Sequence, residues 1–172
     1  MSDKSNNLIS YIAVGLSVFA LVISIVEVTF TRDELRSQAW PYIEIENAYS
    51  ADGFTMTVSN KGVGPAKVRS LTLILDNKPI QNFDEAILKT VGTENAFSFD
   101  VYKSSNPSPG VMSSNESITL FRVPWESRTE LLLEKWRDRF RVQICYCSIF
   151  EDCWLSDTSE VEPKEVSACP AV

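Results

Sequence analysis

The sequence has 172 residues, of which 44% are apolar and 23% are charged, a balance typical of a folded chain rather than a disordered one. Its net charge of −7 argues against nucleic acid as a partner, because nucleic-acid binding needs a cationic surface. It contains no histidine, the commonest general base and the commonest metal ligand. We therefore expect no catalytic activity, no cofactor and no bound metal.

An apolar stretch follows a short polar tail at residues 1–7. The stretch from Leu8 to Val26 contains no charged side chain, and a helix of that length spans roughly 28 Å, close to the thickness of the hydrocarbon core of a bilayer. A cleaved signal peptide is the alternative, but it would have a shorter apolar core, a more basic start and small residues at a cleavage site. We expect a transmembrane helix over residues 8–30 that stays in the lipid bilayer as an anchor.

One face of this predicted helix carries small and polar side chains. They follow heptad spacing and so share one seam: Ser10, Ala13, Ser17, Ala20, Ser24 and Glu27. Small residues let two helices approach closely in lipid, where tight packing replaces the hydrophobic drive. The seam predicts contact with another transmembrane helix, either in a homo-oligomer or in a membrane complex. The alternative is a chance register of common residues.

The charges that flank the helix leave its orientation nearly balanced. Lys4 and the α-amino group precede it, Arg32 and Arg36 follow it, and acidic residues count little in the positive-inside rule. This balance leans slightly toward a cytoplasmic domain, whereas the four cysteines lean weakly the other way. We expect a single-pass protein of the cell (inner) membrane.

Residues 31–41 are expected to link the helix to a domain. Thr31 and Glu34 have the spacing of a helix start, which predicts a short helical extension. The residue before Pro41 is pushed out of the helical region, so the extension is expected to end there.

From residue 42 onward the hydrophobic period changes to two, the period of β-strands. Strands are predicted at residues 42–46, 54–59, 67–75, 96–102, 117–123 and 140–150, with a short return strand through Trp154. The first two flank a turn signal and predict a β-hairpin. This number of short strands favours a two-sheet β-sandwich over residues 42–157.

Two segments of the domain have other patterns. Residues 127–138 predict one inserted helix that turns Leu132, Leu133 and Trp136 toward the core. Residues 83–91 fit one or two helical turns. Residues 158–172 are polar and are expected to form a loose C-terminal tail.

The segment from Asn60 to Ala66 reads Asn-Lys-Gly-Val-Gly-Pro-Ala and stands between two predicted strands. It resembles the N-x-G-x-G-P-A turn of immunoglobulin-like sandwich modules in bacterial cell-surface and membrane proteins, including the CARDB-like group. The strand from Ile144 to Phe150 is also similar to the I-x-Y-x-x-I-F strand of small uncharacterised bacterial single-pass membrane proteins. The resemblance implies a transmembrane helix followed by an immunoglobulin-like β-sandwich, and it implies no activity, since fold does not fix function.

The turn residues of this segment also have a physical interpretation. Gly62 and Gly64 permit a positive φ or a close approach of backbones, and Pro65 fixes φ where the chain leaves the turn. With Asn60 they predict a structural turn.

The cysteines are Cys145, Cys147, Cys153 and Cys169. Cys145 and Cys147 share one face of a strand and point in parallel, which makes them poor disulfide partners, whereas Cys147 and Cys153 flank a tight turn and form the candidate disulfide. Free buried thiols are an open alternative. The spacing matches no common zinc or iron–sulfur framework.

Together these features predict a membrane-anchored protein-interaction or scaffolding module, such as an accessory subunit of a membrane complex. The alternative is a thiol-based redox or metal-responsive membrane sensor built on Cys145, Cys147 and Cys153.

Overall fold

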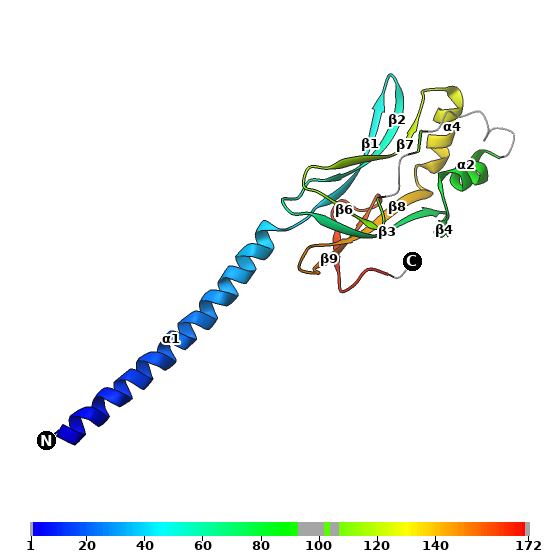
Figure 1. Ribbon diagram of the computed structural model, residues 1–172. Coiled ribbons are helices and arrows are strands. Elements are labelled where there is room, and N and C mark those ends of the chain that lie inside the picture. Colours follow the sequence, from blue (N-terminus) through cyan, green and yellow to red (C-terminus); the bar gives the residue numbers. More distant parts are fainter. Residues whose placement is uncertain (1, 93–101, 104–106, 171–172) are drawn as a thin grey trace. The chain divides into compact units, whose positions relative to one another are not determined.

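The computed structural model describes residues 2–92, 102–103 and 107–170, and the chain divides after Gln38 into two compact units, a helix and a β domain (Figure 1). Because the two units are separate bodies, each is described by itself.

The first unit is helix α1, Ser2–Gln38. Its 37 residues correspond to about 55 Å of helix. All side chains described between Tyr11 and Leu35 are exposed, and the helix is long and apolar enough to cross a membrane. The predicted helical extension after residue 30 is confirmed, but α1 is continuous through it, so Thr31 starts no new helix. The helix ends ahead of Pro41, as predicted.

The first sheet of the β domain has four strands in the order β1-β2-β7-β5. The strands are β1 (Ile43–Ser50), β2 (Gly53–Asn60), β5 (Tyr102–Lys103) and β7 (Ser117–Val123). Strands β1 and β2 form the predicted hairpin, with Ser50 opposite Gly53 at its tip. β1 forms one edge of this sheet.

The second sheet has six strands, of which five follow the order β10-β9-β8-β3-β4. The strands are β3 (Ala66–Leu75), β4 (Lys78–Ile80), β6 (Gly110–Met112), β8 (Phe140–Cys147), β9 (Cys153–Asp157) and β10 (Lys164–Val166). β6 pairs with the start of β3, on the same side as β4. All pairings in both sheets are antiparallel.

Both sheets and the helices of the domain contribute side chains to one hydrophobic core. The hairpin supplies Phe54 and Val58, β3 supplies Val68, and β8 supplies Val142 and Ile144. Alternation along each strand turns these residues inward and the polar ones outward. The domain is therefore mainly β, with two antiparallel sheets around one core.

The predicted single inserted helix needs a correction, because the described part of the domain has two, α2 (Phe83–Val91) and α4 (Ser127–Trp136). The side chain of Asn82 caps α2 by accepting a hydrogen bond from Glu85 N at 2.9 Å. α4 turns Leu132 and Trp136 into the core, as predicted. It ends at Trp136, and its N-cap is Glu126, which makes no side-chain cap bond.

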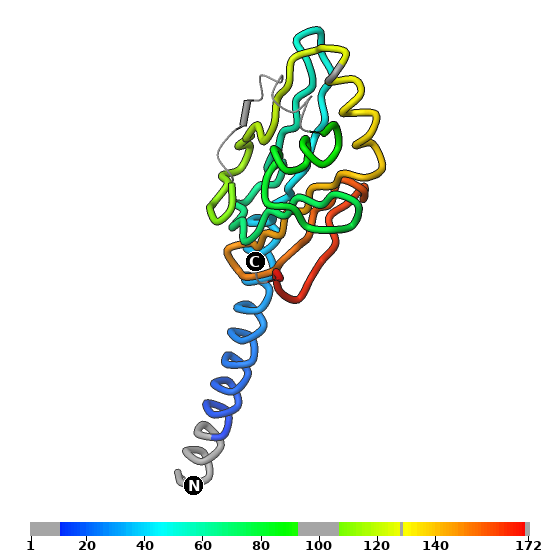
Figure 2. Tube along the Cα trace, turned by 90° about the vertical axis from the view of Figure 1, so that its right-hand side faces the viewer, coloured from blue at the N-terminus to red at the C-terminus, as the bar shows by residue number. Residues whose placement is uncertain are grey.

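The C-terminal segment, expected to be a loose tail, is tied to the second sheet. Lys164–Val166 pair with β9, and Cys169 is bonded to Cys145 of β8. Figure 2 shows this red segment returning beside the orange strands. Within this polar segment, Lys164–Val166 form the outermost strand of the second sheet. Of the strand predicted at residues 96–102, all but Tyr102 lies outside the described residues.

Candidate functional site

The predicted glycine turn lies at the end of the β domain where the chain arrives from α1, and Asn60 is its centre. The Asn60 side chain is fully buried, and its Oδ1 accepts hydrogen bonds from Tyr42 N at 3.2 Å and Gly62 N at 3.1 Å. Its Nδ2 donates to Gly64 O at 2.9 Å and to the carbonyls of Met112 and Ser113, each at 3.2 Å. One side chain thus holds three segments of chain together.

The glycines of this turn are required by close approach and not by a positive φ. A Cβ on Gly64 would lie 2.1 Å from the Ala39 carbonyl oxygen, and one on Gly62 would lie 2.4 Å from Tyr42 N. Neither residue has a positive φ. The turn packs directly against residues 39–42 through its glycines, and Pro65 follows at its exit.

Two disulfides lie at the same end of the domain. They join Cys145 to Cys169 and Cys147 to Cys153, and no cysteine is free. Cys147 is directly opposite Cys153 in the β8–β9 pair, the register that the spacing had left open. The Cys147 and Cys169 sulfurs are 3.9 Å apart, so the two disulfides adjoin.

The six seam residues of the long apolar helix all lie within α1. Because the helix is continuous from Ser2 to Gln38, their heptad spacing keeps them on one face. The Ser17 hydroxyl donates to the Ala13 carbonyl at 2.9 Å, so its polarity is satisfied inside the helix. Ser17 therefore presents a small surface without an unpaired polar group.

The other end of the β domain carries an open cleft of about 780 Å³, which is within the usual range of ligand-binding pockets. It lies between the inner face of the β1–β2 hairpin, helix α4, the start of β8 and residues 158–159. Its aromatic lining consists of Tyr49, Phe54, Trp125, Trp136 and Phe140. Along β1, its nearest lining residue, Asn47, lies about 13 Å of strand from Ile43.

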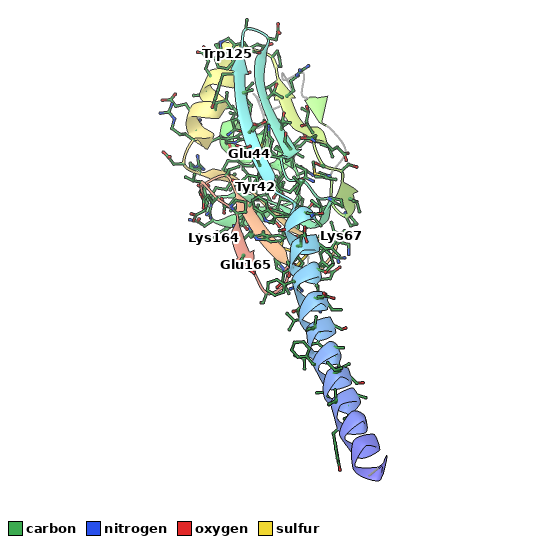
Figure 3. All side chains as sticks on the ribbon, turned by 90° about the vertical axis from the view of Figure 1, so that its left-hand side faces the viewer. Tyr42, Glu44, Lys67, Trp125, Lys164 and Glu165 are labelled. Atoms are coloured by element: carbon green, nitrogen blue, oxygen red, sulfur yellow. A yellow bond between two sulfur atoms is a disulfide. The ribbon has the colours of Figure 1, made fainter. Side chains whose placement is uncertain are left out.

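The cleft has a rigid floor and exposed walls. Trp136 and Phe140 stack with ring centroids 4.4 Å apart, and Trp136 Nε1 donates to Thr90 Oγ1 at 2.9 Å. Tyr49 and Trp125 meet edge to face at 6.3 Å, yet they are 66% and 45% exposed. Figure 3 shows Trp125 at the end of the hairpin away from Tyr42. Exposed aromatic rings beside a fixed floor are typical of a binding surface.

The charged lining of the cleft consists of Glu130, Glu134, Arg137, Asp138 and Arg141. Arg141 Nη1 lies 3.7 Å from Asp157 Oδ2. Burial by itself raises the pKa of the Asp157 carboxyl, but hydrogen bonds from Gln143 and Ser159 and the Arg141 charge outweigh burial and hold that pKa below its ordinary value. Asp157 therefore stays ionised beside the cleft at neutral pH.

Sequence reasoning missed this cleft because its walls come from segments up to about a hundred residues apart. One local signal exists in β1, whose inward positions read Ile43, Ile45, Asn47 and Tyr49. The first is buried, whereas the last two are exposed. The change from aliphatic to polar and aromatic marks where the strand leaves the core.

A scan against models of protein families finds no match, and searches of curated proteins and of solved structures find none either. The resemblance of the Asn60–Ala66 turn to immunoglobulin-like modules therefore stays a prediction.

Proposed function

We propose that this chain is a membrane-anchored protein-interaction module in which α1 lies in the bilayer and the β domain binds another protein, as an accessory subunit of a membrane complex. The observation that carries the proposal is the aromatic cleft, where Tyr49 and Trp125 are exposed over a floor of stacked rings. Tryptophan and tyrosine are enriched among the residues that dominate protein interfaces.

In this proposal the β domain is an immunoglobulin-like sandwich that lies on the outer side of the cell membrane. Two antiparallel sheets around one core and the glycine turn support the fold. The two disulfides support the side, because disulfides persist in oxidising compartments and are rare in the cytosol. They outweigh the slight preference of the flanking charges for the cytoplasm.

The seam of α1 supplies a second contact in the bilayer with another transmembrane helix. Leucine at Ala13, Ser17 or Ala20 would separate the two backbones and weaken that association. Alanine at Leu16 or Phe19, on other faces, serves as the control. Equal effects on both sets, measured by co-purification in mild detergent, would contradict a seam.

The cleft is tested by photo-crosslinking in intact cells. A benzophenone amino acid replaces Tyr49 or Trp125 in the full chain, and replaces Val111 of β6, which is 65% exposed, as the matched control. We expect one discrete adduct from the two cleft positions and none from the control. The absence of any adduct from both cleft positions would overturn the proposed function.

The adjoining disulfides favour a second candidate function, a thiol-based redox sensor. A dithiol reductant that opens Cys147–Cys153 transfers two electrons and two protons and is itself oxidised to a disulfide. The Cys147 thiolate, whose sulfur lies 3.9 Å from Cys169, can then attack Cys169, form a new bond to it and release Cys145 as a thiolate. Reduction of Cys147–Cys153 would thereby reach Cys145, which is fully buried.

This candidate is tested with Cys153→Ser, which leaves Cys147 as a thiol. Peptide mapping without reductant is expected to find Cys147–Cys169 together with Cys145–Cys169. If only Cys145–Cys169 forms, there is no exchange. In the disulfide-bonded structure the sulfurs of Cys147, Cys153 and Cys169 lie within 4.8 Å of one another. Full reduction would turn them into soft ligands for a metal, and zinc titration of the reduced protein measures that.

A further inference from the structure

We propose that the free edge of β1 binds an extended, basic segment of the partner protein as an added strand. The inference rests on the protein-interaction function proposed above and defines the kind of segment that is bound.

The first observation is a row of unpaired backbone groups. Lys61 N donates to Tyr42 O, and hydrogen bonds alternate along an antiparallel pair, so odd-numbered residues of β1 point away from β2. The Ile43 carbonyl already accepts from Ser156 Oγ at 2.6 Å. Within the described chain, the N–H and C=O groups of Ile45, Asn47 and Tyr49 have no hydrogen-bond partner. Such an edge is the template for strand addition.

The second observation is that two hollows follow the same edge. The smaller, of about 150 Å³, lies beside residues 42–45, and the aromatic cleft lies beside Asn47 and Tyr49. Thr158 lines both, so the hollows adjoin. Side chains of an added strand point alternately to its two faces, so every second one would enter a hollow. The edge offers backbone pairing and side-chain pockets together.

The third observation is charge. Seven acidic and two basic residues line the two hollows: Glu44, Glu130, Glu134, Asp138, Asp157, Glu160 and Glu162 against Arg137 and Arg141. Within the described residues, Glu44 and Glu162 form no ion pair. Lysine or arginine on the incoming strand would complement this surface.

The same charges disfavour a second copy of this chain as the occupant. Pairing β1 with another β1 in the antiparallel register centred on Ile45 would set Glu44 of each copy opposite Glu46 of the other, and like charges across a strand pair are destabilising. The occupant is therefore a different protein, with a segment of about seven residues that alternates aromatic or apolar side chains with basic ones.

The edge is tested by panning a displayed library of random ten-residue peptides on the full chain in nanodiscs of neutral lipid. Asn47→Pro is the matched negative, because proline removes an N–H that points away from β2 and is tolerated at sheet edges. We expect enriched peptides that alternate aromatic and basic residues and bind Asn47→Pro at least about tenfold more weakly. No enrichment, acidic peptides, or equal binding to Asn47→Pro would overturn the proposal.

Amide hydrogen exchange of the full chain, measured with and without the most enriched peptide, shows which residues the peptide binds. Strand addition predicts new protection at Ile45, Asn47 and Tyr49 and unchanged exchange at Glu46 and Ala48, which already face β2. Protection of all five, or of none, contradicts it.

The charge-reversal variants Glu44→Lys and Glu162→Lys test the same surface without a proline, so the result does not depend on whether Asn47→Pro folds. Each is expected to weaken peptide binding about tenfold without changing the melting temperature. Photo-crosslinking from position 125 separates the two proposals. If the adduct also forms when Asn47→Pro is present, the proposed function stands and strand addition is rejected. If no adduct forms even without Asn47→Pro, both proposals are rejected.

Discussion

The two ends of the β domain differ in how far their polar and aromatic groups are satisfied by contacts within the domain. At the end near Ala39, the buried Asn60 side chain, two closely packed glycines and two disulfides tie separate segments of the domain together. At the tip of the hairpin, exposed aromatic rings line an open cleft, and the neighbouring strand edge has unpaired backbone groups. The first end shows how contacts within the domain are satisfied, whereas the second keeps exposed rings and unpaired backbone groups, the features on which the proposed binding of another protein rests.

The largest expected effect is at Asn60. Asn60→Ala removes a hydrogen-bond partner from three carbonyls and two N–H groups, of which Ser113 O still accepts from Glu116 N at 3.1 Å. Each buried group left unpaired costs about 1–3 kcal/mol, so we expect a loss of about 4 kcal/mol in the free energy of unfolding. Chemical denaturation of the protein in detergent measures it. Asn47→Ala, an exposed asparagine on the same hairpin, is the control and should change stability by less than about 0.5 kcal/mol. Equal losses of stability in the two variants would contradict the conclusion that Asn60 holds its end of the domain together.

The disulfides come next. Loop-closure entropy predicts a loss of about 3.5 kcal/mol for Cys145→Ser with Cys169→Ser, and about 2.4 kcal/mol for Cys147→Ser with Cys153→Ser. The first pair closes the longer loop, with a sequence separation of 24 against 6. Thermal unfolding of the two double variants gives the order, and a reversed order would show that loop length does not set their contributions.

Substitutions in the aromatic cleft are expected to weaken partner binding and to leave the stability of the domain nearly unchanged. Tyr49→Ala and Trp125→Ala should each lower the free energy of unfolding by less than about 1 kcal/mol, because both rings are substantially exposed. Co-purification of the partner should fall at least about tenfold. Val111→Ala provides the control for a general loss of exposed apolar surface. A large loss of stability without loss of the partner would mean that these rings belong to the core.

The smallest expected effect concerns Asp157. Its lowered pKa means that the folded state favours the carboxylate, so the resulting stability is complete above the ordinary value of 3.8 and is lost as pH falls through the lower pKa of the folded protein. Acid unfolding of Asp157→Asn should therefore be less steep than that of the wild type below this pH. Identical acid transitions would show that Arg141, Gln143 and Ser159 do not stabilise the charge.

Local pattern predicted much of the fold. The apolar run predicted α1, the change to period two predicted the hairpin and β3, and Pro41 predicted where the long helix ends. The segment at residues 83–91 was harder, because its nine residues are too few for the helical period to separate it from a turn. Its cap by Asn82 depends on backbone geometry that propensity does not reveal.

The sequence by itself determined the long apolar helix, the β class and the presence of a structural turn, because each depends on residues within one or two segments. The tertiary structure alone decided that Cys145 pairs with Cys169, that residues 164–166 join a sheet, and that Tyr49 and Trp125 share a cleft. The physical reason is sequence separation. Helical and strand periods act over neighbours, whereas strand order places distant segments side by side, and only that order exposes the edge of β1.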